Sequence, residues 1–191
     1  SHNHNDTGSF ILYKDGKPFI IDVGVESYTK QTFSPQRYEI WTMQSAWHNL
    51  PTFDGIMQEA GAAYCATDVQ IYDDGISMDI ANAYPPQAGL LSYIREVRLR
   101  DSGVVLHDTL RKRGADAGEA VLSLMLCEKP VLQDGIIAAG SLGKIELHAA
   151  RLGSIRVESV AITDQRLRRA WPDTLYRVLV SFGGELTFLL S

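Results

Sequence analysis

The sequence has few cysteines, no long apolar run and no excess of positive charge, and each shortage excludes a class of protein. Cys65 and Cys127 are its two cysteines, too few for a disulfide framework. They could form a single disulfide, but their apolar neighbours lead us to expect two buried thiols. No segment approaches the ~20 apolar residues of a membrane-spanning helix. A formal net charge of -5 argues against general nucleic-acid binding and against simple electrostatic capture of a polyanionic sugar.

The start of the chain lacks an initiating Met and a signal-peptide pattern. A chain that begins at Ser1, directly on its richest motif, is expected to be a fragment or a processed product. Its 191 residues, of which 45% are hydrophobic and 21% charged, suffice for one globular domain with its own core. We therefore expect residues 1–191 to form a single domain.

Helical periodicity over ten or more residues is missing as well, and only residues 57–63 are compatible with one short helical turn. The chain instead reads as a series of hairpins, because alternating segments flank turn signals such as Asp15-Gly16 and Asp74-Gly75. Many short strands with turn residues between them are typical of sandwiches and barrels. We predict an all-β fold, a large antiparallel β-sandwich of the super-sandwich type. Its strands are expected at residues 10–13, 19–22, 69–72, 76–80, 93–100, 104–110, 120–127, 131–132, 136–137, 144–149, 154–162, 176–182 and 185–190.

Charged residues within and between these strands are interpreted as facing solvent. Basic residues cluster around Arg95, around Arg111 and around Arg166, and solvated strand ends and turns explain them better than a track for a polysaccharide. Asp108 is expected to end its strand at a turn. Its neighbour His107 is expected to be an ordinary strand residue.

The most informative feature is the pair His2 and His4. In an extended segment both imidazoles face the same side, because side chains repeat every second residue. Such a pair offers two neutral nitrogens to one metal, or one to a metal and the other to a substrate. Asp22, which ends an apolar run, and His48 are the nearest further candidates, and two histidines with one carboxylate are a common set for Zn²⁺. The hairpin at Asp15-Gly16 favours the approach of His4 to Asp22. For His2 taken alone, a solvated terminal histidine is the simpler interpretation.

Several further elements agree, in order, with a known family. They are His2 with Asp6-Thr7-Gly8-Ser9-Phe10, Tyr13-Lys14-Asp15-Gly16-Lys17-Pro18, Ile21-Asp22-Val23-Gly24, Tyr28, Trp47-His48-Asn49 and Asp54-Gly55. This pattern resembles the C-terminal β-sandwich domain of the heparinase II/III-like polysaccharide lyases. The resemblance is dense over roughly the first third of the chain.

The resemblance implies roles for individual residues. His4, Asp22 and His48 would hold a metal, usually zinc, that chiefly braces the site, while His2 would face the sugar as an acid/base residue. Tyr28 matches a family aromatic that would line the cleft, and the competing interpretation is a packed tyrosine with its hydroxyl at the surface. The implied reaction is β-elimination at a uronic acid, which needs stabilisation of the charge on the carboxylate, a base near C5 and an acid at the leaving O4.

The resemblance also implies parts that this sequence does not contain. In the family, a Tyr and a carboxylate-neutralising Asn or His come from a preceding α/α-toroid domain, and no stretch of this chain has the helical pattern for it. We therefore expect an isolated chain to be inactive and a longer bacterial lyase to supply the toroid as a partner. The expected substrate is an acidic polysaccharide or oligosaccharide, such as a glycosaminoglycan or alginate, and the expected location is the periplasm or the exterior.

Two other functions compete with a lyase domain. One is a non-catalytic carbohydrate-binding module with a structural metal, which exposed Trp41 or Trp47 would favour. The other is a cupin-like metalloenzyme, since cupins also use His-x-His in a β-barrel. The cupin pattern needs a Glu a few residues after the pair, whereas the first Glu here is Glu26, so we rank it last.

Overall fold

A computed structural model describes residues 3–114 and 119–191, and these fold mainly into antiparallel strands. The strands are β1 (Leu12–Lys14), β2 (Lys17–Ile20), β3 (Pro51–Thr52), β4 (Thr67–Tyr72), β5 (Gly75–Asp79), β6 (Leu90–Arg100), β7 (Gly103–Lys112), β8 (Ala120–Leu126), β9 (Pro130–Gln133), β10 (Ile136–Ala139), β11 (Gly143–Ala161) and β12 (Thr174–Leu190). Between them lie short 3₁₀ helices: η1 (Gln31–Phe33), η2 (Pro35–Glu39), η3 (Trp41–Met43), η4 (Ser45–Trp47), η5 (Ala81–Ala83), η6 (Pro86–Ala88) and η7 (Leu167–Arg169). No helix in this described part of the chain is long and apolar enough to span a membrane.

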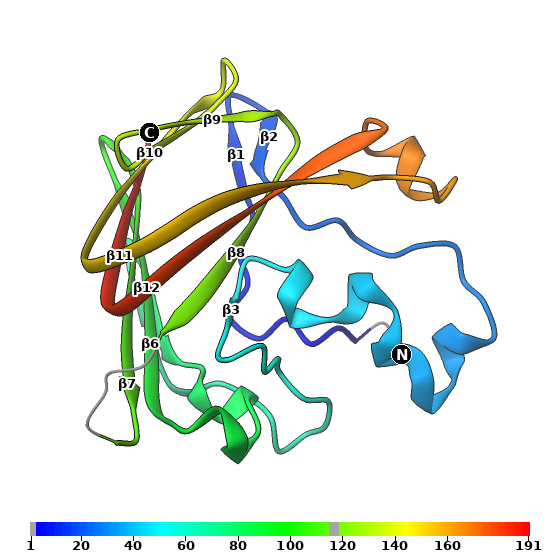
Figure 1. The fold of residues 1–191 in the computed structure, drawn as a ribbon, viewed down its shortest axis with the longest axis horizontal. Helices are drawn as coiled ribbons and strands as arrows, with labels where there is room; N and C mark the ends of the chain where they lie inside the picture. The colour runs from blue at the N-terminus through cyan, green and yellow to red at the C-terminus, as the bar shows by residue number, and fades with distance from the viewer. Residues whose placement is uncertain (1–2, 115–118) are drawn as a thin grey trace.

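The strands join into one curled sheet. Its main path runs β1-β2-β8-β12-β7-β6-β5-β4, while β11 pairs with β12 and β10, β9 with β10, and β3 with β8. In Figure 1 the second half of β12 runs beside β7, whereas its first half and the part of β11 paired with it cross the molecule at a steep angle to β6 and β7, so that the sheet folds over into two layers. Fully buried side chains such as Tyr93, Leu106, Leu122, Val180 and Phe188 form one contiguous core. The predicted large antiparallel β-sandwich is confirmed.

The last strand connects the two layers. The sequence predicted separate strands at 176–182 and 185–190, but β12 is continuous, and its first half pairs with β8 while its second half pairs with β7. The bend falls at Gly183-Gly184, where Gly184 has a φ of +77° and a Cβ on Gly183 would lie 2.6 Å from the Arg151 guanidinium. The glycines therefore permit a corner inside a strand, where we expected a turn. Residues 144–149 and 154–161 likewise belong to one strand, β11, whose irregular register bends it without ending it.

The first hairpin agrees with its prediction. Strands β1 and β2 pair across Asp15-Gly16, which have φ values of +51° and +74°, the left-handed geometry of a tight hairpin turn. The short helical turn with which residues 57–63 were compatible is not formed, since that segment has no helix. The helices that exist between β2 and β3 are 3₁₀ turns of three to five residues, too short for a helical pattern in the sequence.

The structure contradicts the expectations for four residues, namely the two cysteines, Arg95 and Asp108. Cys65 is exposed and Cys127 half-buried, and both thiols are free; Cys65 lies in the loop before β4. Arg95, expected in solvent, is 1% exposed, and Asp108 lies inside β7 with no exposed surface. The reason is register: Arg95 on β6 stands opposite Asp108 on β7, so the two opposite charges are buried as a pair.

Candidate metal centre

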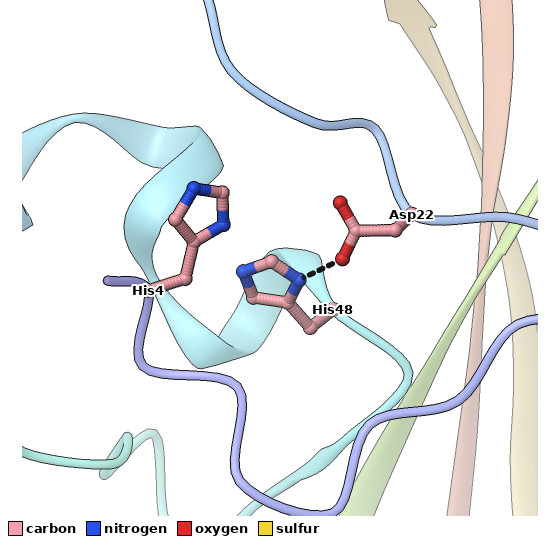
Figure 2. A group of neighbouring side chains, drawn as sticks. All are labelled: His4, Asp22 and His48. Carbon is pink, nitrogen blue, oxygen red and sulfur yellow. Dashed lines mark hydrogen bonds and ion pairs between the residues drawn. The ribbon is translucent and has the colours of Figure 1, made fainter. Parts of the chain in front are cut away.

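The candidate ligands come from three segments that the fold brings to one place (Figure 2). His4 lies in the N-terminal segment, which is tied to η3 by the Asn5 N–H donating to the Met43 carbonyl, 3.0 Å. Asp22 follows β2 by two residues, and the intervening Ile21 N–H donates to the Met125 carbonyl of β8. His48 directly follows η4. The predicted convergence of these three residues is therefore present in the fold.

The side chains are close enough to share one ion. One ligand atom from each of His4, Asp22 and His48 lies within 4.8 Å of the other two, and the two imidazole rings are 5.3 Å apart between centroids. The Nδ1 of His48 is 2.7 Å from Oδ2 of Asp22. The other carboxylate oxygen, Oδ1, accepts the Gly24 N–H at 2.7 Å.

The second nitrogen of His48 is the feature that calls for a ligand. A carboxylate only accepts hydrogen bonds, so in the neutral ring Nδ1 carries the proton and Nε2 carries a lone pair. This Nε2 atom is buried and has no hydrogen-bond partner, and Figure 2 shows it facing the His4 ring. A buried polar atom without a partner is costly. The chemistry of the donor set, two imidazoles and one carboxylate, fits a cation.

The protonation states favour a cation too. Burial lowers the pKa of His4 below its ordinary value, and the neighbouring His48 lowers it further. Burial alone would raise the pKa of Asp22, but the hydrogen bonds from His48 and from the Gly24 N–H outweigh it and hold the pKa below its usual value. The two groups are thus poised as neutral imidazole and ionised carboxylate, the forms that bind a metal.

The remaining residues singled out in the sequence are His2, Tyr28, Trp41 and Trp47. His2 falls outside the described residues. Tyr28 is 40% exposed; Phe33 contacts its ring edge-on and the Arg166 guanidinium lies 4.6 Å from its centroid. Trp41 and Trp47 are half-buried and pack edge to face on each other. Tyr28 therefore has a surface to offer a ligand, and both tryptophans serve mainly in packing.

A pocket beside His4 was not predicted. It has a volume of about 350 Å³, and its lining includes His4, Tyr38, Tyr64, Asp6 and Glu59. Tyr38 also accepts a hydrogen bond from Asn3 at its hydroxyl, 3.3 Å. The two tyrosines had no signal in the sequence, because they come from η2 and from the loop before β4, far along the chain from the histidine motif.

The family described as "Heparinase II/III-like, C-terminal" matches residues 1–171. The chain belongs to this family. A search of curated proteins found no match.

Solved structures of heparinase-like proteins share the fold. One titled as a heparinase III is 15% identical with a TM-score of 0.66, and the match covers 97% of this chain and 29% of that chain. A heparan sulfate lyase HepC from Pedobacter heparinus is 17% identical with a TM-score of 0.64, and the match covers 98% of this chain and 30% of that one. A mutant of the same enzyme is 16% identical, with the same TM-score and the same coverage. The chain thus spans about three-tenths of the length of these structures.

Proposed function

We propose that this chain is the β-sandwich part of a bacterial polysaccharide lyase that cleaves uronic-acid-containing glycans by β-elimination. The observation that carries the proposal is the meeting of His4, Asp22 and His48 within 4.8 Å in a chain of the heparinase II/III-like family. Glycosaminoglycans are the first candidates for substrate, because the similar solved structures are titled as a heparinase and heparan sulfate lyases. Alginate is the second.

The three residues are proposed to hold one metal ion, with zinc preferred for a set of two imidazoles and one carboxylate. When bound, the ion would supply positive charge and cross-link three segments that are distant in sequence. The side chains themselves fix the site: Asp22 orients His48 through Nδ1 and is itself oriented by the Gly24 N–H. We expect this ion to brace the site.

His2 is the proposed acid/base residue. In the elimination, a base removes the proton at C5 of the uronate, the bond between C4 and its oxygen breaks, a C4–C5 double bond forms, and an acid protonates the leaving oxygen. An imidazole with an ordinary pKa near neutrality suits either proton transfer. His2 stands two positions before the candidate ligand His4, which supports its assignment to the substrate side of the same centre. Tyr28, exposed beside Phe33 and Arg166, is the proposed contact to the sugar.

The remaining catalytic groups are proposed to come from an N-terminal α/α-toroid domain of the same protein. The coverage of about three-tenths of the similar structures supports such a partner. An isolated chain of residues 1–191 is then expected to be inactive. The proposed location of the complete protein is the periplasm or the exterior, where polymeric uronates are found.

The test is an assay of the complete protein on a panel of uronate polymers, reading the ultraviolet absorbance of the unsaturated product. We expect cleavage of at least one polymer, loss of turnover in His2→Ala, and unchanged metal content and folding in that variant. Full activity in His2→Ala would remove its catalytic role. Binding of a polymer without any unsaturated product would favour the carbohydrate-binding module instead.

A further inference from the structure

The three segments that carry the candidate ligands meet at one buried side chain, Asn49. Its Nδ2 donates to the Phe10 carbonyl at 2.6 Å and to the Ile21 carbonyl at 3.0 Å. Its Oδ1 accepts the Met125 N–H of β8 at 2.8 Å. Asn49 has no exposed surface and directly follows His48. One amide therefore joins the segment of His4, the residue before Asp22 and the central sheet.

A second buried side chain, Arg95 of β6, connects the segment of His4 to the segment of His48. Arg95 Nη1 donates to the Asn49 carbonyl at 2.7 Å and to the Gly8 carbonyl at 2.9 Å. Gly8 belongs to the N-terminal segment that carries His4. A single guanidinium nitrogen thus bridges the backbone of the His4 segment and the backbone next to His48.

The guanidinium is itself fixed by two residues of the sheet. Asp108 accepts from Nε of Arg95 at 2.9 Å and from Nη2 at 2.7 Å, a bidentate pair whose two side chains are 1% and 0% exposed. The Tyr93 hydroxyl donates to Asp108 at 2.6 Å. Burial raises the pKa of this hydroxyl, and the Asp108 charge raises it further, so Tyr93 stays a donor. We call Asn49, Arg95, Asp108 and Tyr93 the polar hub.

We propose that Asn49 and Arg95 are positioning residues that set the mutual placement of His4, Asp22 and His48. This inference rests on the proposed metal centre and concerns how its ligands are preorganised. Neither residue touches the ligand side chains by any hydrogen bond described above; both act on the backbone that carries them. Groups behind the ligands commonly govern metal affinity in this way.

The chemistry of each residue suits its position. Asn49 needs two donors and one acceptor in one plane, and an amide supplies both kinds where a carboxylate supplies acceptors only. Arg95 needs a planar fork for Asp108 and further N–H groups for two carbonyls, which a lysine ammonium cannot match in geometry. Asn49→Asp and Arg95→Lys therefore break the proposed function of each residue with little change in volume.

The experiment uses the complete protein that contains this chain, as wild type, Asn49→Asp, Arg95→Lys and the control Ile145→Ala. Ile145 is fully buried on β11 and forms part of the apolar core, so its truncation destabilises the sandwich and leaves every hub hydrogen bond in place. Three quantities are measured: the Kd for zinc by competition with a chelator, the visible absorption spectrum of the Co²⁺-substituted protein, and amide hydrogen exchange of the metal-free protein.

We expect Asn49→Asp and Arg95→Lys to raise the zinc Kd by about 10- to 100-fold and to change the Co²⁺ spectrum. Ile145→Ala should keep the zinc Kd within about twofold of the wild-type value, even if its melting temperature falls below those of the hub variants. In the metal-free protein, both hub variants should speed exchange in residues 4–10, 20–23 and 47–50 together, and the control should not.

The inference is overturned if the hub variants fold and bind zinc with the wild-type Kd and spectrum. It is also overturned if only the mutated segment exchanges faster. If a hub variant does not fold, Ser9→Ala takes its place: Ser9 Oγ accepts the Asn49 N–H at 3.2 Å, and the same effects should appear at smaller size. Wild-type protein that binds no zinc would refute the proposed metal centre, while the exchange data would still decide whether the hub places the three segments.

Discussion

The candidate metal centre and the polar hub lie side by side in the fold and differ in how completely their polar groups are paired. In the centre, the buried Nε2 of His48 has no hydrogen-bond partner, and the side chain of Asp22 is 31% exposed. In the hub, each guanidinium nitrogen of Arg95 donates a hydrogen bond, and Asp108 accepts three. The hydrogen-bonding groups of the hub are therefore satisfied within the protein. In the centre, a ligand at Nε2 would remove the cost of an unpaired buried polar atom.

This difference in pairing suggests different roles for the hub and the centre. A buried charged pair contributes little net stability compared with apolar residues of the same shape, but breaking it is costly. The hub is therefore best understood by what it holds, namely the backbone at Gly8 and Asn49. The centre is distinguished by the donor set that it offers to a ligand, two imidazoles and one carboxylate.

Breaking the charge pair of the hub should have the largest effect. Asp108→Asn leaves Arg95 buried without its counter-charge, and we expect the free energy of unfolding to fall by about 3–5 kcal/mol. Denaturant unfolding of wild type and variant measures this directly. A loss below about 1 kcal/mol would contradict the view that Asp108 neutralises Arg95.

The double variant Arg95→Met, Asp108→Leu separates stability from positioning. Replacing both charges by apolar residues removes the unpaired buried charge and should recover part of the lost stability. The recovery is incomplete, because the Tyr93 hydroxyl and the Gly8 and Asn49 carbonyls lose their partners. Zinc affinity should stay low, because no group then holds the Gly8 and Asn49 carbonyls. Recovery of both quantities together would assign the hub a role in stability alone.

The next largest effect concerns the centre. Zinc at 100 times its Kd should raise the free energy of unfolding of the wild type by about 2.7 kcal/mol. His48→Ala should abolish this gain and the bound zinc, because Nε2 is removed. The matched control is His148→Ala, since His148 is an exposed histidine on β11. This variant should keep the bound zinc and the gain in the free energy of unfolding. Elemental analysis and thermal unfolding with and without zinc are the measurements, and unchanged stoichiometry in His48→Ala would remove this residue from the ligand set.

The candidate centre was predictable from sequence and the hub was not, for physical reasons. The alternation of His2 and His4, the hairpin at Asp15-Gly16 and the family pattern together selected His4, Asp22 and His48. A hairpin is a local signal, so it correctly indicated which strands lie side by side.

Burial of Arg95 depends on non-local register. Alternating strands of apolar and charged residues normally face solvent on their charged side, so Arg95 was placed there and Asp108 at a turn. Only the pairing of β6 with β7 sets the two charges opposite each other. The corner at Gly183-Gly184 was missed for a related reason, since a glycine pair signals a turn and a bend within a strand equally well.

Loss of a buried hydrogen bond between uncharged groups should destabilise the protein less than Asp108→Asn does. The Tyr84 hydroxyl donates to the Pro51 carbonyl at 2.7 Å, and burial raises the pKa of Tyr84. Tyr84→Phe removes one uncharged donor, so we expect a loss of about 1–2 kcal/mol in denaturant unfolding and no change in zinc Kd. A loss as large as that of Asp108→Asn would show that burial alone, and not charge, makes the hub sensitive.

The smallest effect is expected at Asp74, a partly exposed residue in the turn before β5 that pairs with Arg98 and Arg100 on the strand of Arg95. Arg98 donates to Asp74 at 2.7 Å, and Arg100 donates to it as well. The hydrogen bonds from Arg98 and Arg100 lower the pKa of Asp74 below its ordinary 3.8. Its stabilising contribution is thus present above pH 3.8 and is lost as the pH falls through the lowered pKa.

Asp74→Asn makes the same chemical change as Asp108→Asn, but at a site open to solvent, where exposed ion pairs are worth little. We expect its melting temperature to lie slightly below that of the wild type at neutral pH, and the two curves to converge as the pH falls below 3.8. Melting temperatures measured between neutral and acid pH test this. If Asp74→Asn were as damaging as Asp108→Asn, the sensitivity of the hub would follow from Arg–Asp pairing in general, and burial would no longer distinguish the two sites.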